Sequence, residues 1–228
     1  MKPILTGILV AALWTSKAST LRADSFTPLS EHSEADGAID DWNSGRFKQA
    51  LAKWTIEAAS SSQILLYNIG IIYWNGSGVP QDFAKAISWF EKAAMKGYQP
   101  AKHAIGNAYR RGECVMKDPL AAVQWYKQAA EKGYAPSQVL LGAMYMGNKR
   151  IPRDISEALA WHRKAAEQGY SYGQLNLATM YHDGVGVPKD VAHAMKVYKL
   201  TLARADLNDD ARKLAQRRLL DIGFGRNN

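Results

Sequence analysis

The feature that most constrains this chain is a 36-residue period running from residue 63 to residue 206. Four copies follow one another, and the same residue types return at the same places. A fixed period of this length is typical of helical solenoids, in which each repeat is a helix pair that packs against its neighbours. The residues that match in all four copies are Tyr73, Tyr109, Tyr145 and Tyr181; Asp82, Asp118, Asp154 and Asp190; and Ala86, Ala122, Ala158 and Ala194.

Two further series match in three copies and change in the fourth. Gly70, Gly106 and Gly142 are followed by Ala178, and Trp89, Trp125 and Trp161 are followed by Val197. Alternating small and aromatic residues let helix backbones approach closely while rings fill the space beside them. Burying one such ring contributes on the order of a few kcal/mol, so helix pairs must stack to be stable.

Each copy predicts a first and a second helix. In the second copy, apolar residues spaced i, i+3, i+4, i+7 and i+8 from Ala101 form one helical stripe. After a loop, Asp118 has the place of an N-cap for the second helix. Gly133 suits a left-handed position followed by Tyr134, which predicts a Schellman ending. The fold class we predict is therefore all-α.

The chain on either side of the repeats predicts two caps. Trp42 and Gly45 match the Tyr-x-x-Gly end of a first helix, and Trp54 lies in a second helix that follows a shorter loop. Asn208 can cap a last helix with a polar outer face, as a solenoid end requires. We expect one continuous solenoid over residues 34–228, divided into an N-terminal capping repeat 34–62, repeats 63–98, 99–134, 135–170 and 171–206, and a C-terminal capping helix 207–223.

The repeat resembles the Sel1-like repeat, a subfamily of the tetratricopeptide-type helical repeats. The resemblance implies a right-handed α/α superhelix whose first helices line a concave face that binds a protein or an extended peptide. The third copy departs from the family pattern in its loop, residues 147–151. The first copy carries the pattern as Ile69-Gly70, Tyr73, Gly76, Gly78-Val79, Asp82, Lys85-Ala86, Trp89-Phe90 and Lys92-Ala93-Ala94.

The N-terminus predicts export. Lys2 precedes an apolar run from Ile4 to Trp14, and small residues flank Lys17 before a cleavage site after Ala18. The run has eleven residues, short of the ~20 that a spanning helix needs. We predict a signal peptide over residues 1–18, a flexible leader over 19–33, and a periplasmic or secreted protein with no stable membrane span after cleavage. A retained anchor is the alternative.

The charge of the chain is basic but dispersed. The net charge is +8, and without Lys2 and Lys17 it is +6. Lys and Arg occur in every repeat rather than in one run, which is typical of solvated helix faces. We therefore expect no nucleic-acid partner, although weak attraction to acidic envelope polymers stays open.

The sequence carries no recognisable catalytic or metal-binding motif. No G-x-S-x-G elbow, phosphate-binding glycine motif or dinucleotide fingerprint occurs. Cys114 is the single cysteine, so an intramolecular disulfide is excluded, and it is either a tolerated substitution or a bridge to a partner. We expect no cofactor, no metal and no enzymatic activity. The histidines, which lack metal-ligand spacing, are His32, His103, His162, His182 and His193.

The resemblance places the binding surface on the first helices, and we expect the residues at their outward-facing positions to contact a partner. Trp74 with Arg110 and Arg111 has the composition of an interaction hot spot, whereas ordinary half-exposed side chains are the alternative interpretation. The predicted partner-binding residues are Tyr67, Ile71, Trp74, His103, Asn107, Arg110, Arg111, Val139, Ala143, Met146, Leu175, Thr179 and His182.

The leading functional hypothesis is an exported, non-catalytic scaffold or adaptor that binds another protein. Two alternatives come from relatives of the repeat family. One is a periplasmic regulatory inhibitor of a membrane sensor. The other is an envelope hydrolase acting on cell-wall fragments or β-lactams, which the absence of a nucleophile–base pair and of paired cysteines disfavours.

Overall fold

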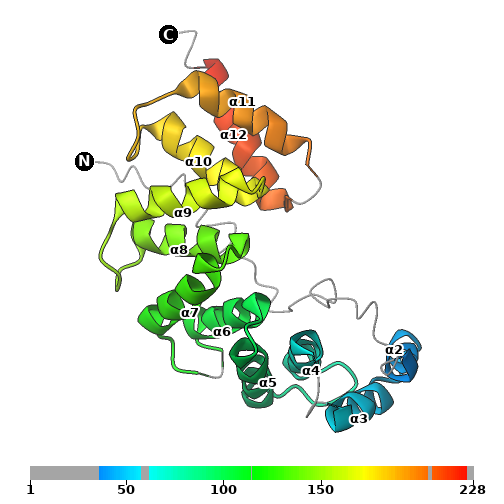
Figure 1. Cartoon of the computed structure of the whole chain (residues 1–228). Coiled ribbons are helices and arrows are strands. Elements are labelled where there is room, and N and C mark those ends of the chain that lie inside the picture. Colours follow the sequence, from blue (N-terminus) through cyan, green and yellow to red (C-terminus); the bar gives the residue numbers. More distant parts are fainter. Residues whose placement is uncertain (1–35, 58–61, 114, 205–206, 225–228) are drawn as a thin grey trace. The chain divides into compact units, whose positions relative to one another are not determined.

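The computed structural model describes residues 36–57, 62–113, 115–204 and 207–224. Over these ranges the chain is entirely helical and has no strand, as Figure 1 shows. The sequence prediction of an all-α fold is confirmed. The helices are α2 (Asp36–Asn43), α3 (Phe47–Glu57), α4 (Gln63–Asn75), α5 (Phe83–Met95), α6 (Gln99–Arg111), α7 (Pro119–Glu131), α8 (Ala135–Gly147), α9 (Ile155–Glu167), α10 (Ser171–Asp183), α11 (Val191–Leu202) and α12 (Asp209–Phe224).

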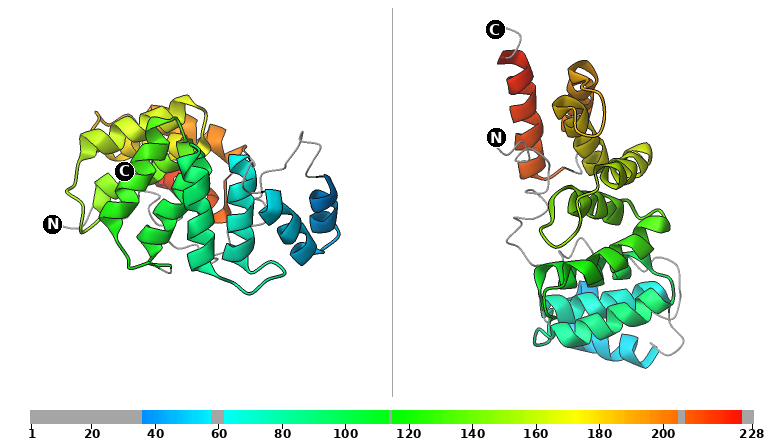
Figure 2. Two further views of the ribbon diagram at one scale, coloured as in Figure 1. Left: turned by 60° about the horizontal axis from the view of Figure 1, so that its bottom comes forward. Right: turned by 90° about the vertical axis from the view of Figure 1, so that its left-hand side faces the viewer.

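The chain divides into two compact units, and the division falls inside α7 between Trp125 and Tyr126. In the N-terminal unit α2 packs on α3, α4 on α5, and α5 on α6. In the C-terminal unit α8 packs on α9, and α10 contacts both α9 and α11 before α12 closes against α11. The alternation of helix and short loop can be followed in both views of Figure 2.

The aspartate that recurs in every copy caps the second helix of its pair. The side chain of Asp82 accepts a hydrogen bond from the backbone N–H of Lys85 at 3.0 Å, and Asp154 accepts one from Glu157 at 3.0 Å. Asp118 and Asp190 make equivalent bonds. These side chains satisfy backbone donors that have no partner within the helix. The N-caps predicted from the sequence are confirmed.

The same aspartates also close the loop between the two helices. The backbone N–H of Asp82 donates to the carbonyl of Tyr73 at 2.9 Å, and that of Asp190 donates to Tyr181 at 2.9 Å. Asp154 reaches the carbonyl of Tyr145 at 3.0 Å in the third copy. This bond therefore survives the altered loop of the third copy. The recurring Tyr and Asp mark the two ends of one hydrogen-bonded connection.

The predicted Schellman ending is also present. Gly133 has φ +84°, and the N–H of Tyr134 donates to the carbonyl of Ala129 at 3.1 Å. Glycine adopts this left-handed conformation without the steric cost that a Cβ would add.

Small residues allow close helix contacts inside both units. A Cβ added at Gly70 on α4 would lie 2.5 Å from the ring of Phe90 on α5. A Cβ at Gly173 on α10 would lie 2.6 Å from the Cβ of Ala165 and 2.7 Å from the backbone nitrogen of Ala166 on α9. Because real Cβ atoms do not approach other atoms this closely, the helices meet at these positions only because glycine is present.

The last helix covers the end of the C-terminal unit. Asn208 accepts a hydrogen bond from the N–H of Ala211 at 2.9 Å, which confirms the predicted cap. Arg218 makes two hydrogen bonds of 3.0 Å to the carboxylate of Asp183 at the end of α10. A bidentate pair of this kind fixes α12 in direction as well as in position.

Several sequence predictions lie outside the described residues. These are the signal peptide 1–18, the leader 19–33, His32 and Cys114. Within the described part of the chain, every helix is too short or too polar to cross a bilayer.

Candidate functional site

The predicted binding residues on α4 are buried. Tyr67, Ile71 and Trp74 are 5%, 1% and 2% exposed. The ring of Tyr67 lies 5.3 Å from that of Phe90, and the ring of Trp74 lies 4.9 Å from that of Phe83. The expectation that these side chains face outward is wrong, because this side of α4 packs against α5 and α6.

The predicted residues on α6 remain partly accessible. His103, Asn107 and Arg111 are half-buried, and Arg110 is 8% exposed. Arg111 lies 3.5 Å from the carboxylate of Glu113. Burial, with the neighbouring charges of Arg110 and Arg111, lowers the pKa of His103 to about 3, which keeps its ring neutral. These four residues form a polar strip on one helix.

The predicted residues on α8 and α10 are mostly core residues. The hydroxyl of Thr179 donates to the carbonyl of Leu175 at 2.9 Å and accepts from the hydroxyl of Tyr198 at 3.3 Å. His182 is half-buried, with its Nδ1 3.5 Å from the same tyrosine hydroxyl. The outward-facing expectation is therefore wrong for Val139, Ala143, Met146, Leu175 and Thr179, all of which are 1% exposed or less.

The physical reason is that a first helix in this fold has neighbours on more than one side. Leu65, Ile69 and Ile72 of α4 pack with α3, while Tyr67, Ile71 and Trp74 pack with α5 and α6. One helical stripe was expected to face the core, but α4 supplies two. Its unusually apolar sequence, from Ile64 to Trp74, is consistent with this double burial.

The structure instead shows a groove in the C-terminal unit, between the second helices α9 and α11. Its floor comes from the first helix α10, through Leu177, Ala178 and Tyr181. The groove has a volume of about 640 Å³. We call it the α9–α11 groove. It is lined by Arg163, Ala166, Glu167, Gln174, Leu177, Ala178, Tyr181, His193, Val197, Leu200 and Arg204.

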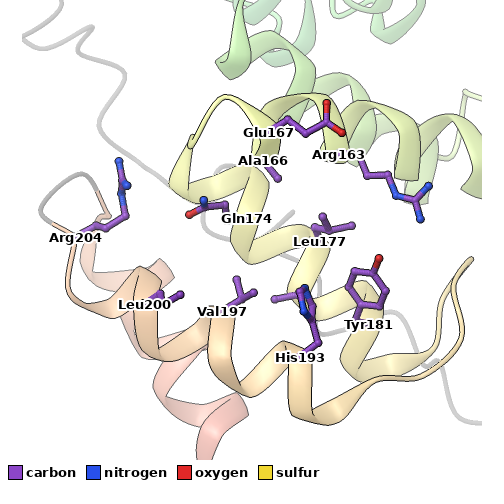
Figure 3. A pocket seen from close by; sticks show the side chains of 11 residues that line it. Arg163, Ala166, Glu167, Gln174, Leu177, Tyr181, His193, Val197, Leu200 and Arg204 are labelled. Carbon is purple, nitrogen blue, oxygen red and sulfur yellow. The ribbon is translucent and has the colours of Figure 1, made fainter.

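The centre of the groove is apolar and its ends are charged. Figure 3 shows Leu177, Val197 and His193 between the ribbons of α10 and α11, with Arg204 and Arg163 at opposite ends. The rings of Tyr181 and His193 meet edge to face with centroids 4.9 Å apart. Leu200, on the last turn of α11, adds an apolar side chain that is 62% exposed.

No residue of this groove belongs to the set of binding residues predicted from the sequence. The available signal was the change in the tryptophan series, since Val197 has the position of Trp89, Trp125 and Trp161. A smaller side chain at a position that is otherwise large leaves space unless a neighbour fills it.

The described residues contain no group of three or more His, Cys, Asp or Glu side chains placed to hold a metal ion. His162 is fully buried on α9, and the described chain offers neither of its ring nitrogens a hydrogen-bond partner. Burial lowers the pKa of His162 to about 4. This histidine packs against Gly142, as Phe90 packs against Gly70, so it has the place of a core aromatic ring.

The helix pairs, the capping aspartates and the glycine contacts define a helical-repeat protein. A family model of the Sel1 repeat matches residues 65–98, 99–134, 135–170 and 171–200. The chain belongs to the Sel1 repeat family, whose members typically serve as protein-interaction scaffolds. No curated protein is significantly similar to the chain.

Solved structures agree with this assignment. A Sel1 repeat protein from Oxalobacter formigenes is 28% identical, with a TM-score of 0.71 over 82% of this chain and 74% of that one. The protein c5321, a protective antigen of uropathogenic Escherichia coli strains, is 27% identical, with a TM-score of 0.68 over 83% of this chain and 45% of that one. A Pseudomonas aeruginosa protein with 18% identity and a TM-score of 0.51, over 86% of this chain and 82% of that one, shares the fold alone.

Proposed function

We propose that this chain is an exported, non-catalytic scaffold that binds another protein, and that the α9–α11 groove is a contact surface. The observation that carries the proposal is the groove itself. It is an open hollow with an apolar centre, formed by three consecutive helices of the C-terminal unit. Concave sites with an apolar floor and a few polar groups at the edge are the usual form of binding sites in proteins.

The polar strip on α6 is a second part of the proposed contact surface. His103, Asn107 and Arg111 are the members of the predicted set in the N-terminal unit that solvent reaches most readily. Arginine is enriched at interaction hot spots because its planar group both stacks and hydrogen-bonds. The buried members of the predicted set are core residues and do not belong to the proposed contact surface.

Export is proposed on the sequence alone. The charged start, the apolar run and the small residues before position 19 support it. The lack of catalytic motifs supports a binding role rather than the hydrolase alternative. A measurable turnover of cell-wall fragments or of a β-lactam by the purified chain would contradict the non-catalytic part of the proposal.

Photo-crosslinking of the full chain in its own cells tests the proposal. A photoreactive phenylalanine analogue replaces Leu200 in the groove, and the control replaces Gln128, which is exposed at the same repeat position 72 residues earlier. We expect one discrete crosslinked protein from position 200, which the purified chain then binds in calorimetry. Identical products from both positions, or a captured protein that does not bind the purified chain, would contradict the proposal.

A further inference from the structure

The α9–α11 groove lies where the repeat pattern leaves out a tryptophan. In the first copy, Trp89 on α5 packs against the core formed by α3 and α4. Val197 on α11 has the equivalent position in the fourth copy, where α9 and α10 take the places of α3 and α4. The first copy therefore shows what occupies this position when the repeat is complete, and that occupant is an indole ring.

The fourth copy also lacks the lysine that covers this tryptophan ring in other copies. In the first copy the ammonium group of Lys92 lies 3.9 Å from the centroid of Trp89, and in the third copy that of Lys164 lies 4.2 Å from the centroid of Trp161. Leu200 has the position of these lysines in the fourth copy. Both the ring and the cation that covers it are thus replaced by smaller or apolar side chains.

The walls of the groove are suited to an aromatic ring. Tyr181 and His193 already meet edge to face, and Leu177 and Val197 complete an apolar surface between them. An added ring can continue this edge-to-face arrangement, which is a preferred geometry for aromatic pairs. The exposed Leu200 can close over the ring as an apolar flank.

The ends of the groove select the charge of the occupant. Arg163 and Arg204 lie at opposite ends in Figure 3, and Glu167 is the single acidic residue in the lining. Arg163 and Glu167 are one helical turn apart, yet the figure shows their side chains pointing in different directions. Acidic groups on both sides of an aromatic residue would therefore meet an arginine at each end.

We infer that the α9–α11 groove binds an aromatic side chain, with tryptophan as the best fit, carried by an acidic segment of a partner protein. The bound ring takes the place that Trp89 has in the first copy, and the acidic residues on either side contact the arginines. This inference rests on the proposed protein-binding function and names the chemistry of the partner at that same groove.

The test uses the purified chain and a fluorescein-labelled peptide, Glu-Asp-Trp-Asp-Glu, in fluorescence anisotropy. Two control peptides replace Trp with Ala or the four acids with Lys. We expect saturable binding of the first peptide and a loss of affinity of about tenfold or more for each control. Failure of the Trp peptide to bind at millimolar concentration, or equal binding of the Ala peptide, would overturn the inference.

Two kinds of variant locate the site. The double substitution Val197→Trp with Leu200→Lys restores the pair formed by Trp89 and Lys92 in the first copy. This rebuilt variant should therefore abolish peptide binding without lowering the melting temperature. Arg163→Ala should weaken binding several-fold, whereas Lys127→Ala, at the same exposed position one repeat earlier, should not. The comparison of Arg163→Ala with Lys127→Ala also tests the inference if the rebuilt variant folds poorly, because both of these residues are on the surface.

The outcomes separate this inference from the proposed function. If a crosslinked partner binds the wild type and the rebuilt variant equally, the scaffold role is supported but the groove is not its binding site. A chain that binds no protein partner contradicts the scaffold role itself. Peptide binding that is unchanged in both Arg163→Ala and the rebuilt variant contradicts the groove assignment.

Discussion

At the scale of single residues, we expect the buried His162 to make the stability of the chain depend on pH. It is 0% exposed, and its pKa of about 4 means that the folded protein binds a proton there less readily than the unfolded chain, whose histidine has a pKa of 6.5. As the pH falls below about 6.5, the unfolded chain takes up the proton first, so stability falls until the folded pKa is reached. One pKa unit corresponds to about 1.4 kcal/mol, so the total loss is about 3 kcal/mol.

Replacing His162 with Phe should remove this dependence. Phenylalanine has no buried nitrogen to leave unpaired, and Phe90 packs on Gly70 in the same way. We expect the variant to be about 1 kcal/mol more stable at pH 7 and to differ most from the wild type near pH 4. Urea unfolding between pH 4 and pH 7.5 measures both. His103 is present in both proteins, so its contribution cancels, and parallel curves would contradict the prediction.

Gly173 is expected to tolerate no side chain. The Cβ of Gly173→Ala would meet the backbone of α9, which cannot move as a flexible side chain can. We expect a loss of about 1–3 kcal/mol in the free energy of unfolding. Gly147→Ala is the control, because a Cβ there meets nothing within 4 Å. Equal effects of the two substitutions would show that helix contact is not the reason for the glycine.

At the scale of the element, the capping aspartates define where each second helix begins. Asp154→Ala removes the acceptor for the N–H of Glu157, and we expect it to destabilise the chain by about 1 kcal/mol. That loss lowers the melting temperature by about 2–4 °C in a chain of this size. Ser156→Ala, on the exposed first turn of α9, should leave the melting temperature unchanged. Thermal unfolding followed by circular dichroism makes the comparison, and equal melting temperatures for the two variants would contradict the role of the cap.

The elements were predictable from the sequence because their signals are local. An aspartate before a helix and a glycine–tyrosine pair after it act through the adjacent backbone, and both appeared where expected. Exposure depends instead on how many helices surround a given one. Trp74 lies off the main apolar stripe of its helix. Its burial against Phe83 and Phe90 depends on tertiary packing, which the spacing of apolar residues does not predict. The groove lies where Val197 replaces the tryptophan of the earlier copies, and the sequence shows this replacement without showing whether a neighbouring side chain fills the space.

At the scale of the whole molecule, export is the expectation with the simplest test. Residues 1–33 fused to alkaline phosphatase should give an active enzyme, because that reporter folds only after it crosses the inner membrane. Replacing Leu5, Ile8 and Leu9 with Asp should abolish the activity by breaking the apolar run. Activity that survives these substitutions, or an inactive fusion from the natural sequence, would contradict export.

The central claim is that this repeat protein acts by binding a partner in the groove that Val197 leaves open. The measurement that tests it most directly is the dissociation constant of the crosslinked partner for the wild type and for the chain with Val197→Trp and Leu200→Lys. We predict a loss of affinity of about tenfold or more with an unchanged or higher melting temperature. An unchanged dissociation constant in a fully folded variant would contradict the account.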